Sequence, residues 1–393
     1  MKEYFYKKEY KYIYLSSILY DFGTALIEIF GTVMLYRAGI SIWFILLIYG
    51  LRFGIAGLVS PLFITISAKL GIAKCMLISN IFRAIGAYMM LNGGVLYNNI
   101  VIFIIVMGFM GISYPFWDSV PSKYIDKQHI GRYNSFIMIC KIIAHALASG
   151  LVALEVITNN TIVLFSMVVI AFLLQYLVIL KFDYKPEKKT NTFTASIRYL
   201  MQIKNKYKII YALKANQTIE KLFVPLYLYI FLQNLTQFSI VIEISLLFQI
   251  IAIILIGKYI DKNIIKSNNL VTTIKIIITG IFLFGKNKTV ISANKILSDN
   301  FEKAYETSIQ TSIQNIIKES KEDNDLLSSV GQMSLCFTKV IMYAILSIIS
   351  KFIGEKVFIV IFILSILSTI FINVNIKLAN DDKNQLIKNY IAY

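Results

Sequence analysis

The chain has 393 residues, of which 57% are apolar and only 16% are charged, and its formal net charge is +17. This composition excludes an ordinary soluble domain, because too few polar residues remain to cover a water-facing surface. The basic excess forms no patch interleaved with aromatic residues, so we expect no nucleic-acid partner. The three cysteines lack metal-ligand spacing, and no Walker loop or nucleophile–base motif occurs. We therefore expect neither an enzyme nor a metal or other cofactor.

Apolar stretches of helical length follow one another along almost the whole chain. Crossing a hydrocarbon core of about 30 Å takes roughly 20 mainly apolar residues in a helix. The first stretch follows a charged N-terminus and is too long for a cleaved signal peptide. The sequence predicts an all-α polytopic membrane protein with twelve transmembrane helices. In chain order they fall near residues 12–36, 41–66, 73–92, 98–120, 134–157, 161–181, 208–232, 236–257, 268–285, 287–315, 326–349 and 353–376.

A basic polar stretch divides these helices into two groups of six. It covers residues 183–207 and lies between an N-terminal half, 1–182, and a C-terminal half, 208–393. Two six-helix halves are typical of many secondary transporters. The second part of the stretch is either an amphipathic helix on the membrane surface or part of a solvated tether.

The basic residues indicate how the chain is oriented in the membrane. Most of the 39 Lys and Arg residues lie at or beside the N-terminus, the even-numbered loops and the C-terminus, and five fall in the odd-numbered loops. Loops rich in Lys and Arg stay on the cytoplasmic side. The sequence therefore predicts a protein of the cytoplasmic membrane with both termini cytoplasmic and its basic surface facing anionic lipid.

Two acidic residues on the first helix are candidate proton or substrate sites. Asp21 and Glu28 are seven residues apart, so they lie on nearly the same helical face. An ionised carboxylate at the bilayer centre costs about 2.5–3.5 kcal/mol on insertion scales, so we expect both to face the bundle interior. Burial favours the protonated form, which suits a proton-coupled transporter. The alternative is a structural ion pair with a buried base such as Arg52 or Arg83.

The helices near 208–232 and 287–315 carry further polar positions. One face of the first helix is polar, and the second has a charged stripe beside an apolar one, as expected of helices that line a cavity. The second is alternatively a surface helix. The polar residues of the first either bind an anionic group of a substrate or, the interpretation that we favour, pair with charges inside the protein. The predicted substrate- or proton-binding residues are Asp21, Glu28, Lys214, Gln217, Glu220, Lys221, Lys295, Asp299 and Glu302.

A degenerate motif occurs at two corresponding loops. The loop after the eighth helix reads GKYIDKNIIK, and the loop after the second helix reads ITISAKLGIAK, with Ala68 in place of the acid. This repeat resembles the cytoplasmic loop motif G-x-x-x-D-[RK]-x-G-[RK]-[RK] of the major facilitator superfamily. The Gly-Arg pair before the fifth helix is similar to another loop of that family. The residues that carry the likeness include Lys69, Gly71, Arg132, Gly257, Asp261 and Lys262.

The resemblance implies a fold in which helices 1, 4, 7 and 10 line a central cavity, and it assigns those six residues to a cytoplasmic gate. The four helices together carry seven acids and four bases, which favours protons or cationic, amphipathic substrates. Two family signals are absent: an intramembrane Arg on helix 4, and a Gly-Pro pair on helix 5.

The sequence therefore predicts a monomeric secondary active transporter that works by alternating access. Its predicted activity is proton-coupled efflux of a small amphipathic compound, such as a drug or a secreted metabolite. A small-molecule substrate, protons and membrane lipid are the expected partners. The alternatives are an uptake carrier for a small solute, a lipid-linked saccharide flippase, and a non-transporting receptor or scaffold with the same bundle.

Overall fold

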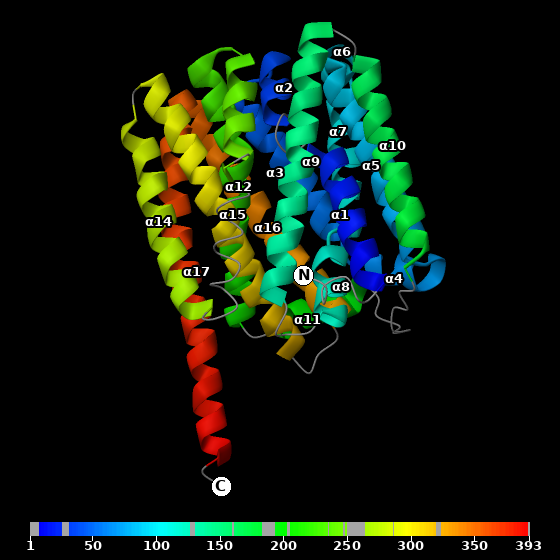
Figure 1. Ribbon diagram of the computed structural model, residues 1–393, viewed down its shortest axis with the longest axis vertical. Coiled ribbons are helices and arrows are strands. Elements are labelled where there is room, and N and C mark those ends of the chain that lie inside the picture. The colour runs from blue at the N-terminus through cyan, green and yellow to red at the C-terminus, as the bar shows by residue number, and fades with distance from the viewer. Residues whose placement is uncertain are drawn as a thin grey trace.

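The computed structural model is a bundle of helices that run mostly along one common direction (Figure 1). It describes residues 8–25, 31–125, 130–158, 161–182, 193–202, 205–234, 236–246, 248–249, 264–285, 287–319 and 324–391. All regular secondary structure within these residues is helical, which confirms the all-α prediction.

The first part of the chain forms the helices α1 (Lys8–Ala25), α2 (Gly31–Arg37), α3 (Ile42–Val59), α4 (Leu62–Leu70), α5 (Ile72–Leu91), α6 (Gly93–Asn98), α7 (Ile100–Phe109), the 3₁₀ helix η3 (Met110–Ser113), α8 (Phe116–Tyr124), α9 (Ile130–Thr158) and α10 (Thr161–Leu180). The rest forms α11 (Phe193–Gln202), α12 (Asn205–Leu232), a helix over Thr236–Leu246, α14 (Ile264–Phe284), α15 (Lys288–Glu319), α16 (Asn324–Ile353), η5 (Gly354–Lys356) and α17 (Val357–Ile391).

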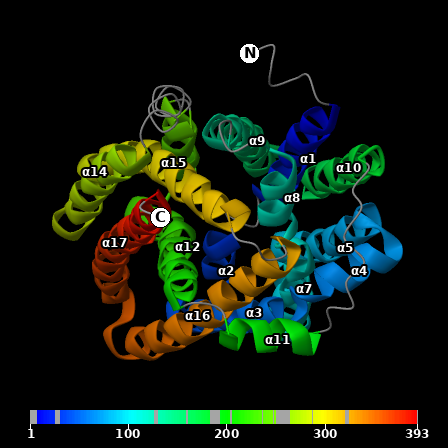
Figure 2. The ribbon, with the colours of Figure 1, turned by 90° about the horizontal axis from the view of Figure 1, so that it is seen from below.

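Two spans that the sequence predicted as single helices are interrupted. The span near 41–66 consists of α3 and α4, which meet at Pro61, and the span near 98–120 consists of α7, η3 and α8, with Pro115 before α8. Proline has no backbone N–H group and clashes with the preceding turn, so it ends or bends a helix at these points. The short α11 lies within the central polar stretch and packs against α16 (Figure 2).

The outside of the bundle is apolar, as a lipid-facing surface requires. Five stretches of the described residues are apolar and long enough to cross a membrane: Ile42–Val59, Ile72–Leu91, Ile100–Tyr124, Ile162–Leu180 and Asp325–Asn375. Helix α10 shows the pattern most clearly, since Ile170, Leu173 and Leu177 are all about half exposed. An apolar surface of this kind is unfavourable in contact with water, but it is not unfavourable in contact with the hydrocarbon of a bilayer. The chain is therefore an integral membrane protein.

The closest helix packing joins segments far apart in the sequence. Helix α3 packs against α16, and a row of glycines on α3 faces it. A Cβ atom on Gly50 would lie 3.0 Å from the Tyr343 Cβ, and one on Gly57 would lie 3.0 Å from the Cys336 Cβ. Small residues at such positions let two helices approach closely in a membrane, where van der Waals packing drives association.

A second close approach lies between η3 and α3, and it generates a prediction about stability. A Cβ on Gly111 would lie 2.6 Å from the Cα and 2.8 Å from the carbonyl oxygen of Ala56, both backbone atoms. We expect Gly111→Ala to destabilise the fold by about 1–3 kcal/mol, because the backbone of α3 must shift. The midpoint of thermal unfolding in detergent measures this effect.

The matched control is Gly280→Ala on α14, where an added Cβ meets no atom within 4 Å. This variant should match or slightly exceed the wild-type midpoint, because alanine favours the helix. Equal midpoints for the two variants would contradict the close approach of η3 to α3.

Candidate functional site

A cavity of about 310 Å³ lies at the centre of the bundle. Its walls come from α1, α8, α12 and α15, which correspond to the predicted helices 1, 4, 7 and 10, and also from α3, α9, α14 and α16. Aromatic residues such as Phe53 and Trp117 share these walls with charged residues. The volume is in the range of small-molecule binding sites. Segments from both ends of the sequence therefore enclose one solute-sized chamber.

Asp21 lies in the cavity wall on α1 and pairs with a base on α9. The Lys141 Nζ is 3.3 Å from the Asp21 Oδ1, and the Ser17 hydroxyl donates a hydrogen bond of 3.1 Å to the Oδ2. The sequence analysis weighed Arg52 and Arg83 as partners for this carboxylate, but the base that pairs with it is Lys141. Periodicity places residues on a face of one helix, and it does not say which helix packs against that face. Glu28 lies outside the described residues.

Helix α12 turns three of its predicted polar residues toward the cavity: Lys214, Gln217 and Lys221. The Lys214 ammonium donates a hydrogen bond of 2.7 Å to the side chain of Gln310, and the Lys221 Nζ lies 3.7 Å from a Glu306 carboxylate oxygen. Both partners lie on α15. The two most polar helices of the C-terminal part therefore face each other across the chamber.

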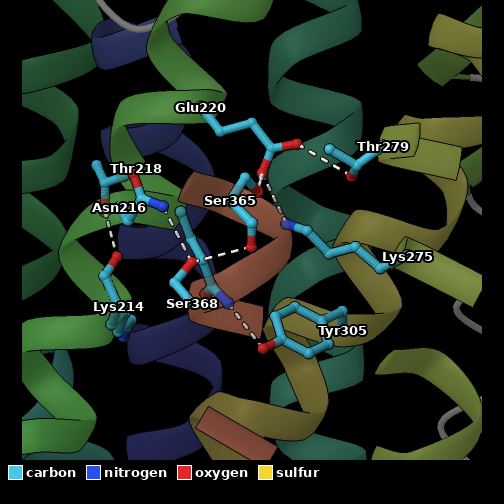
Figure 3. Close-up of polar contacts among 10 residues, drawn as sticks. Lys214, Asn216, Thr218, Glu220, Lys275, Thr279, Tyr305, Ser365 and Ser368 are labelled. Atoms are coloured by element: carbon cyan, nitrogen blue, oxygen red, sulfur yellow. Dashed lines mark hydrogen bonds and ion pairs between the residues drawn. The ribbon is translucent and has the colours of Figure 1, made fainter. Parts of the chain in front are cut away.

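Glu220 belongs to the same helix but is not among the residues that line the chamber, and its carboxylate lies in a buried polar cluster (Figure 3). Its carboxylate lies 3.1 Å from the Lys275 Nζ and accepts hydrogen bonds from Ser365 and Thr279. Lys275 in turn lies over the ring of Tyr305, with its Nζ 5.1 Å from the centroid. This cluster joins α12, α14, α15 and α17, and Lys275 and Tyr305 connect it to the cavity wall.

The remaining predicted residues on α15 form a second polar group. Lys295 and Asp299 pair with each other, and Ser245 donates a hydrogen bond of 2.6 Å to Asp299. Both residues line a small side cavity of about 60 Å³. Glu302 lies in the walls of both this side cavity and the central one.

A network of amide and carboxylate side chains joins α8 and α9 to α15 and α16 at the end of the chamber that carries α8. Asp118 on α8 accepts hydrogen bonds of 2.7 Å from Gln310 on α15 and 2.5 Å from Gln332 on α16. Asn134 on α9 donates to Gln314 on α15 at 2.7 Å. In addition, Ser119 on α8 donates to Asp325 on α16. We call this network the latch. The sequence analysis did not identify it, although uncharged amides within apolar spans are a signal that could have done so.

Two further basic residues of the cavity wall were not among the predicted binding residues. Arg52 on α3 and Lys339 on α16 are both buried, and both lie over the ring of Phe53, with the Arg52 Cζ at 4.7 Å and the Lys339 Nζ at 4.0 Å from its centroid. They were set aside because they lie on helices outside the expected four. An ionisable residue within a span is itself a signal for a functional position.

The predicted gate residues lie at loops, where the structure describes only some of them. Lys69 is exposed at the end of α4, and Gly71 follows with φ +85°, a backbone conformation that favours glycine. Arg132 lies in the first turn of α9. Gly257, Asp261 and Lys262 lie outside the described residues. A gating role for these six residues stays a prediction.

Comparison with known proteins matches this architecture but gives no close relative in sequence. No protein-family model and no curated protein matches the chain. Among solved structures, the nucleoside transporter NupG is 15% identical with a TM-score of 0.64. The match covers 95% of this chain and 99% of the NupG chain. The human organic anion transporter MFSD10 is 11% identical with a TM-score of 0.64, covering 92% and 98%. The fucose:proton symporter FucP of E. coli is 14% identical with a TM-score of 0.59, covering 93% and 96%.

These likenesses and the apolar helices define an all-α polytopic membrane protein. More narrowly, the chain has the fold of the major facilitator superfamily transporters. At 11–15% identity the likeness shows the fold alone, so the chemistry of the solute has to be argued from the residues of this chain.

The latch generates a prediction about access to the chamber. In Asp118→Asn, an amide replaces the carboxylate that accepts from Gln310 and Gln332, so two charge-assisted hydrogen bonds between predicted halves are weakened. A cysteine placed at Ile137 on the cavity wall should then react several-fold faster with a membrane-impermeant maleimide added from the side of α8. Labelling rates in vesicles of each orientation measure this.

The wild type measures the background labelling in this experiment. That background should be low, because the native cysteines Cys75, Cys140 and Cys336 are all buried. The matched control is Ser122→Ala, because the Ser122 hydroxyl donates only within α8, to the Asp118 carbonyl. If Asp118→Asn labelled no faster than this control, the network would not restrict access.

The buried pair of Glu220 and Lys275 generates a prediction about stability. Glu220→Gln should lower the free energy of unfolding by about 3–5 kcal/mol, because it leaves a buried ammonium without its main counter-charge. The double variant Glu220→Gln with Lys275→Met should recover part of that loss, since it removes both charges. Thermal midpoints in detergent test both effects, with the exposed Glu355→Gln as control. A double variant less stable than Glu220→Gln alone would contradict the pairing.

Proposed function

We propose that this protein is a secondary active transporter that moves a small amphipathic solute across the membrane by alternating access. The central chamber carries this proposal, because it has the volume of a small molecule and walls from segments at both ends of the sequence. The polar latch supports it further. Its hydrogen bonds join α8 and α9 to α15 and α16. Such side-chain contacts can break and reform when two rigid groups of helices rock about a fixed site.

We further propose that protons drive this transport and that Asp21 is the coupling residue. Its carboxylate lies in the cavity wall and pairs with Lys141. Protonation of Asp21 would abolish its attraction for Lys141, so proton binding and the ion pair exclude each other. The proton thereby changes the charge that the cavity presents to a solute. This competition gives a direct physical link between a proton and a substrate.

In this proposal both termini face the cytoplasm, so the latch lies at the cytoplasmic end of the chamber. The two proposed six-helix halves, 1–182 and 208–393, are the groups that rock. The mixed aromatic and charged walls suit an amphipathic solute. We propose export as the direction, from the sequence. The net direction of any secondary carrier is set by the gradients that drive it. The protein acts in this scheme as a monomer in the cytoplasmic membrane.

The test is solute-driven proton movement in proteoliposomes, followed with an entrapped pH-sensitive dye. The panel contains cationic, neutral and anionic compounds, and gradients are imposed in both directions. We expect at least one compound to move protons with the wild type. In Asp21→Asn this flux should fall to the level of empty vesicles, because the proton-binding group is gone. Glu355→Gln, which removes an exposed carboxylate outside the chamber, should behave as wild type.

The other outcomes separate the parts of the proposal. Solute movement without proton movement would leave a carrier and remove proton coupling. Proton flux retained in Asp21→Asn would assign coupling to another carboxylate, with Glu302 as the next to test because it also lines the chamber. If no compound crossed faster than in empty vesicles, the carrier proposal would be wrong, and a receptor, a scaffold or a flippase for lipid-linked saccharides would take its place.

A further inference from the structure

We propose that the solute carries an anionic group, and that the buried guanidinium of Arg52 binds this group inside the central cavity. The proposal rests on the carrier function above and names the class of its substrate: an organic anion with a flat apolar body. Three observations lead to it, namely the charge balance of the cavity wall, the surroundings of Arg52, and the aromatic residues beside it.

The charge balance reverses the one counted from the sequence. Among the described residues that line the cavity, the bases are Arg52, Lys141, Lys214, Lys221, Lys275 and Lys339. The acids are Asp21, Asp118, Glu302 and Glu306. The four helices used for the sequence count omitted α3, α9, α14 and α16, which supply four of these bases. A chamber with more bases than acids attracts an anion rather than a cation.

The bases differ in how far their charge is already matched. Lys141 pairs with Asp21, Lys221 with Glu306, and Lys275 with Glu220. Arg52 has no such carboxylate partner among the described residues. The groups that interact with it are the phenols of Tyr114, Tyr49 and Tyr343, and the phenol of Tyr114 also shares a hydrogen bond with it.

The donors of Arg52 are also incompletely used. The residue is 5% exposed, and its Nε and Nη1 atoms are buried without a hydrogen-bond partner within the described residues. Nearly all buried polar groups in proteins have a partner, and a buried guanidinium with two unused nitrogens is costly. Such a group is retained where a ligand completes it.

Arg83 on α5 shows how this chain buries an arginine for structural purposes. Its Nη2 donates to Tyr20 and Ser113 at 2.8 Å each, and its Nη1 donates to Asn80 at 3.2 Å. It does not line the central cavity. Arg83 therefore has both terminal nitrogens bound by protein groups and only its Nε without a partner, and it lies outside the cavity wall, whereas Arg52 has a terminal nitrogen as well as its Nε without a partner and lies in the cavity wall.

The chemistry of the ligand follows from these surroundings. A guanidinium offers parallel N–H donors that match a carboxylate, phosphate or sulfonate. Lys339, whose Nζ lies 4.0 Å from the centroid of the Phe53 ring, adds a second cation beside Arg52. The rings of Phe53, Tyr114 and Trp117 in the same wall suit a flat organic body.

The test is direct binding, read by the fluorescence of Trp117. The chain has only two tryptophans, and Trp43→Phe leaves Trp117 as the single reporter inside the cavity. The probes are 4-nitrobenzoate, 4-nitrobenzenesulfonate and the neutral 4-nitrobenzamide, which quench tryptophan and share one shape but differ in charge. We expect saturable quenching by the anions at concentrations at least about tenfold below those needed for the amide.

Two substitutions locate the effect at Arg52. In Arg52→Gln the preference for the anions should disappear, and in Arg52→Lys it should be largely kept, because the positive charge remains. The matched control Arg37→Gln removes an exposed arginine of α2 outside the cavity and should leave both affinities unchanged. If Arg52→Gln failed to fold, the comparison of anions with the amide in the parent protein would still decide the class of ligand.

Equal quenching by the anions and the amide, or no saturable quenching by either anion up to millimolar concentrations, would overturn the proposal. An anion preference unchanged in Arg52→Gln would overturn the assignment to Arg52. None of these results bears on whether solute crosses the membrane. The transport panel decides that separately, so failure of anion binding and failure of the carrier function are distinguishable.

Discussion

The electrostatics of burial in a bilayer determine much of this structure. An ionised side chain in hydrocarbon is strongly disfavoured unless it faces the protein interior and finds a partner there. Two buried carboxylates of the spans follow this rule: Asp21 lies against Lys141, and Glu220 lies against Lys275. Helices that carry such residues therefore turn them toward the protein interior, whereas apolar side chains such as those of α10 face outward.

The same constraint explains why amides join the helices at one end of the chamber. Glutamine and asparagine side chains donate and accept hydrogen bonds without bringing a full charge into the membrane. At the latch, Gln310 and Gln332 share one carboxylate, Asp118, so a single protein charge holds two helices. Individual side-chain hydrogen bonds contribute only about 0.5–1.5 kcal/mol net, and those to charged groups about 1.5–3. A closure built from a few of them is strong enough to hold one state and weak enough to release it.

The sequence predicted the order and positions of most helices because the length of an apolar stretch is set by the bilayer. It also placed Asp21, Lys214 and Lys221 on faces that line the chamber, since periodicity within one helix suffices for that. It did not predict the partner of Asp21 or the residues of the latch, because these depend on which helices meet. Pro61 and Pro115 could have indicated the two helix interruptions, but the apolar residues continue on both sides of each proline, so each stretch was predicted as a single helix. The loop motif led to the right fold, although half of its residues lie outside the described part of the chain.

The error in the charge count is the most informative of these differences. Counting acids and bases on four helices favoured protons or cations, whereas the full wall of the chamber carries more bases than acids among its described residues. Two of the four bases that reverse the balance stand on α3 and α16, two helices that pack closely through the glycines of α3. Close packing at this point brings Arg52 and Lys339 together over one aromatic ring. Two cations near one ring make the potential of this wall more positive, which favours an anionic solute. The packing that joins distant parts of the chain would thus also create the demand for a negatively charged solute.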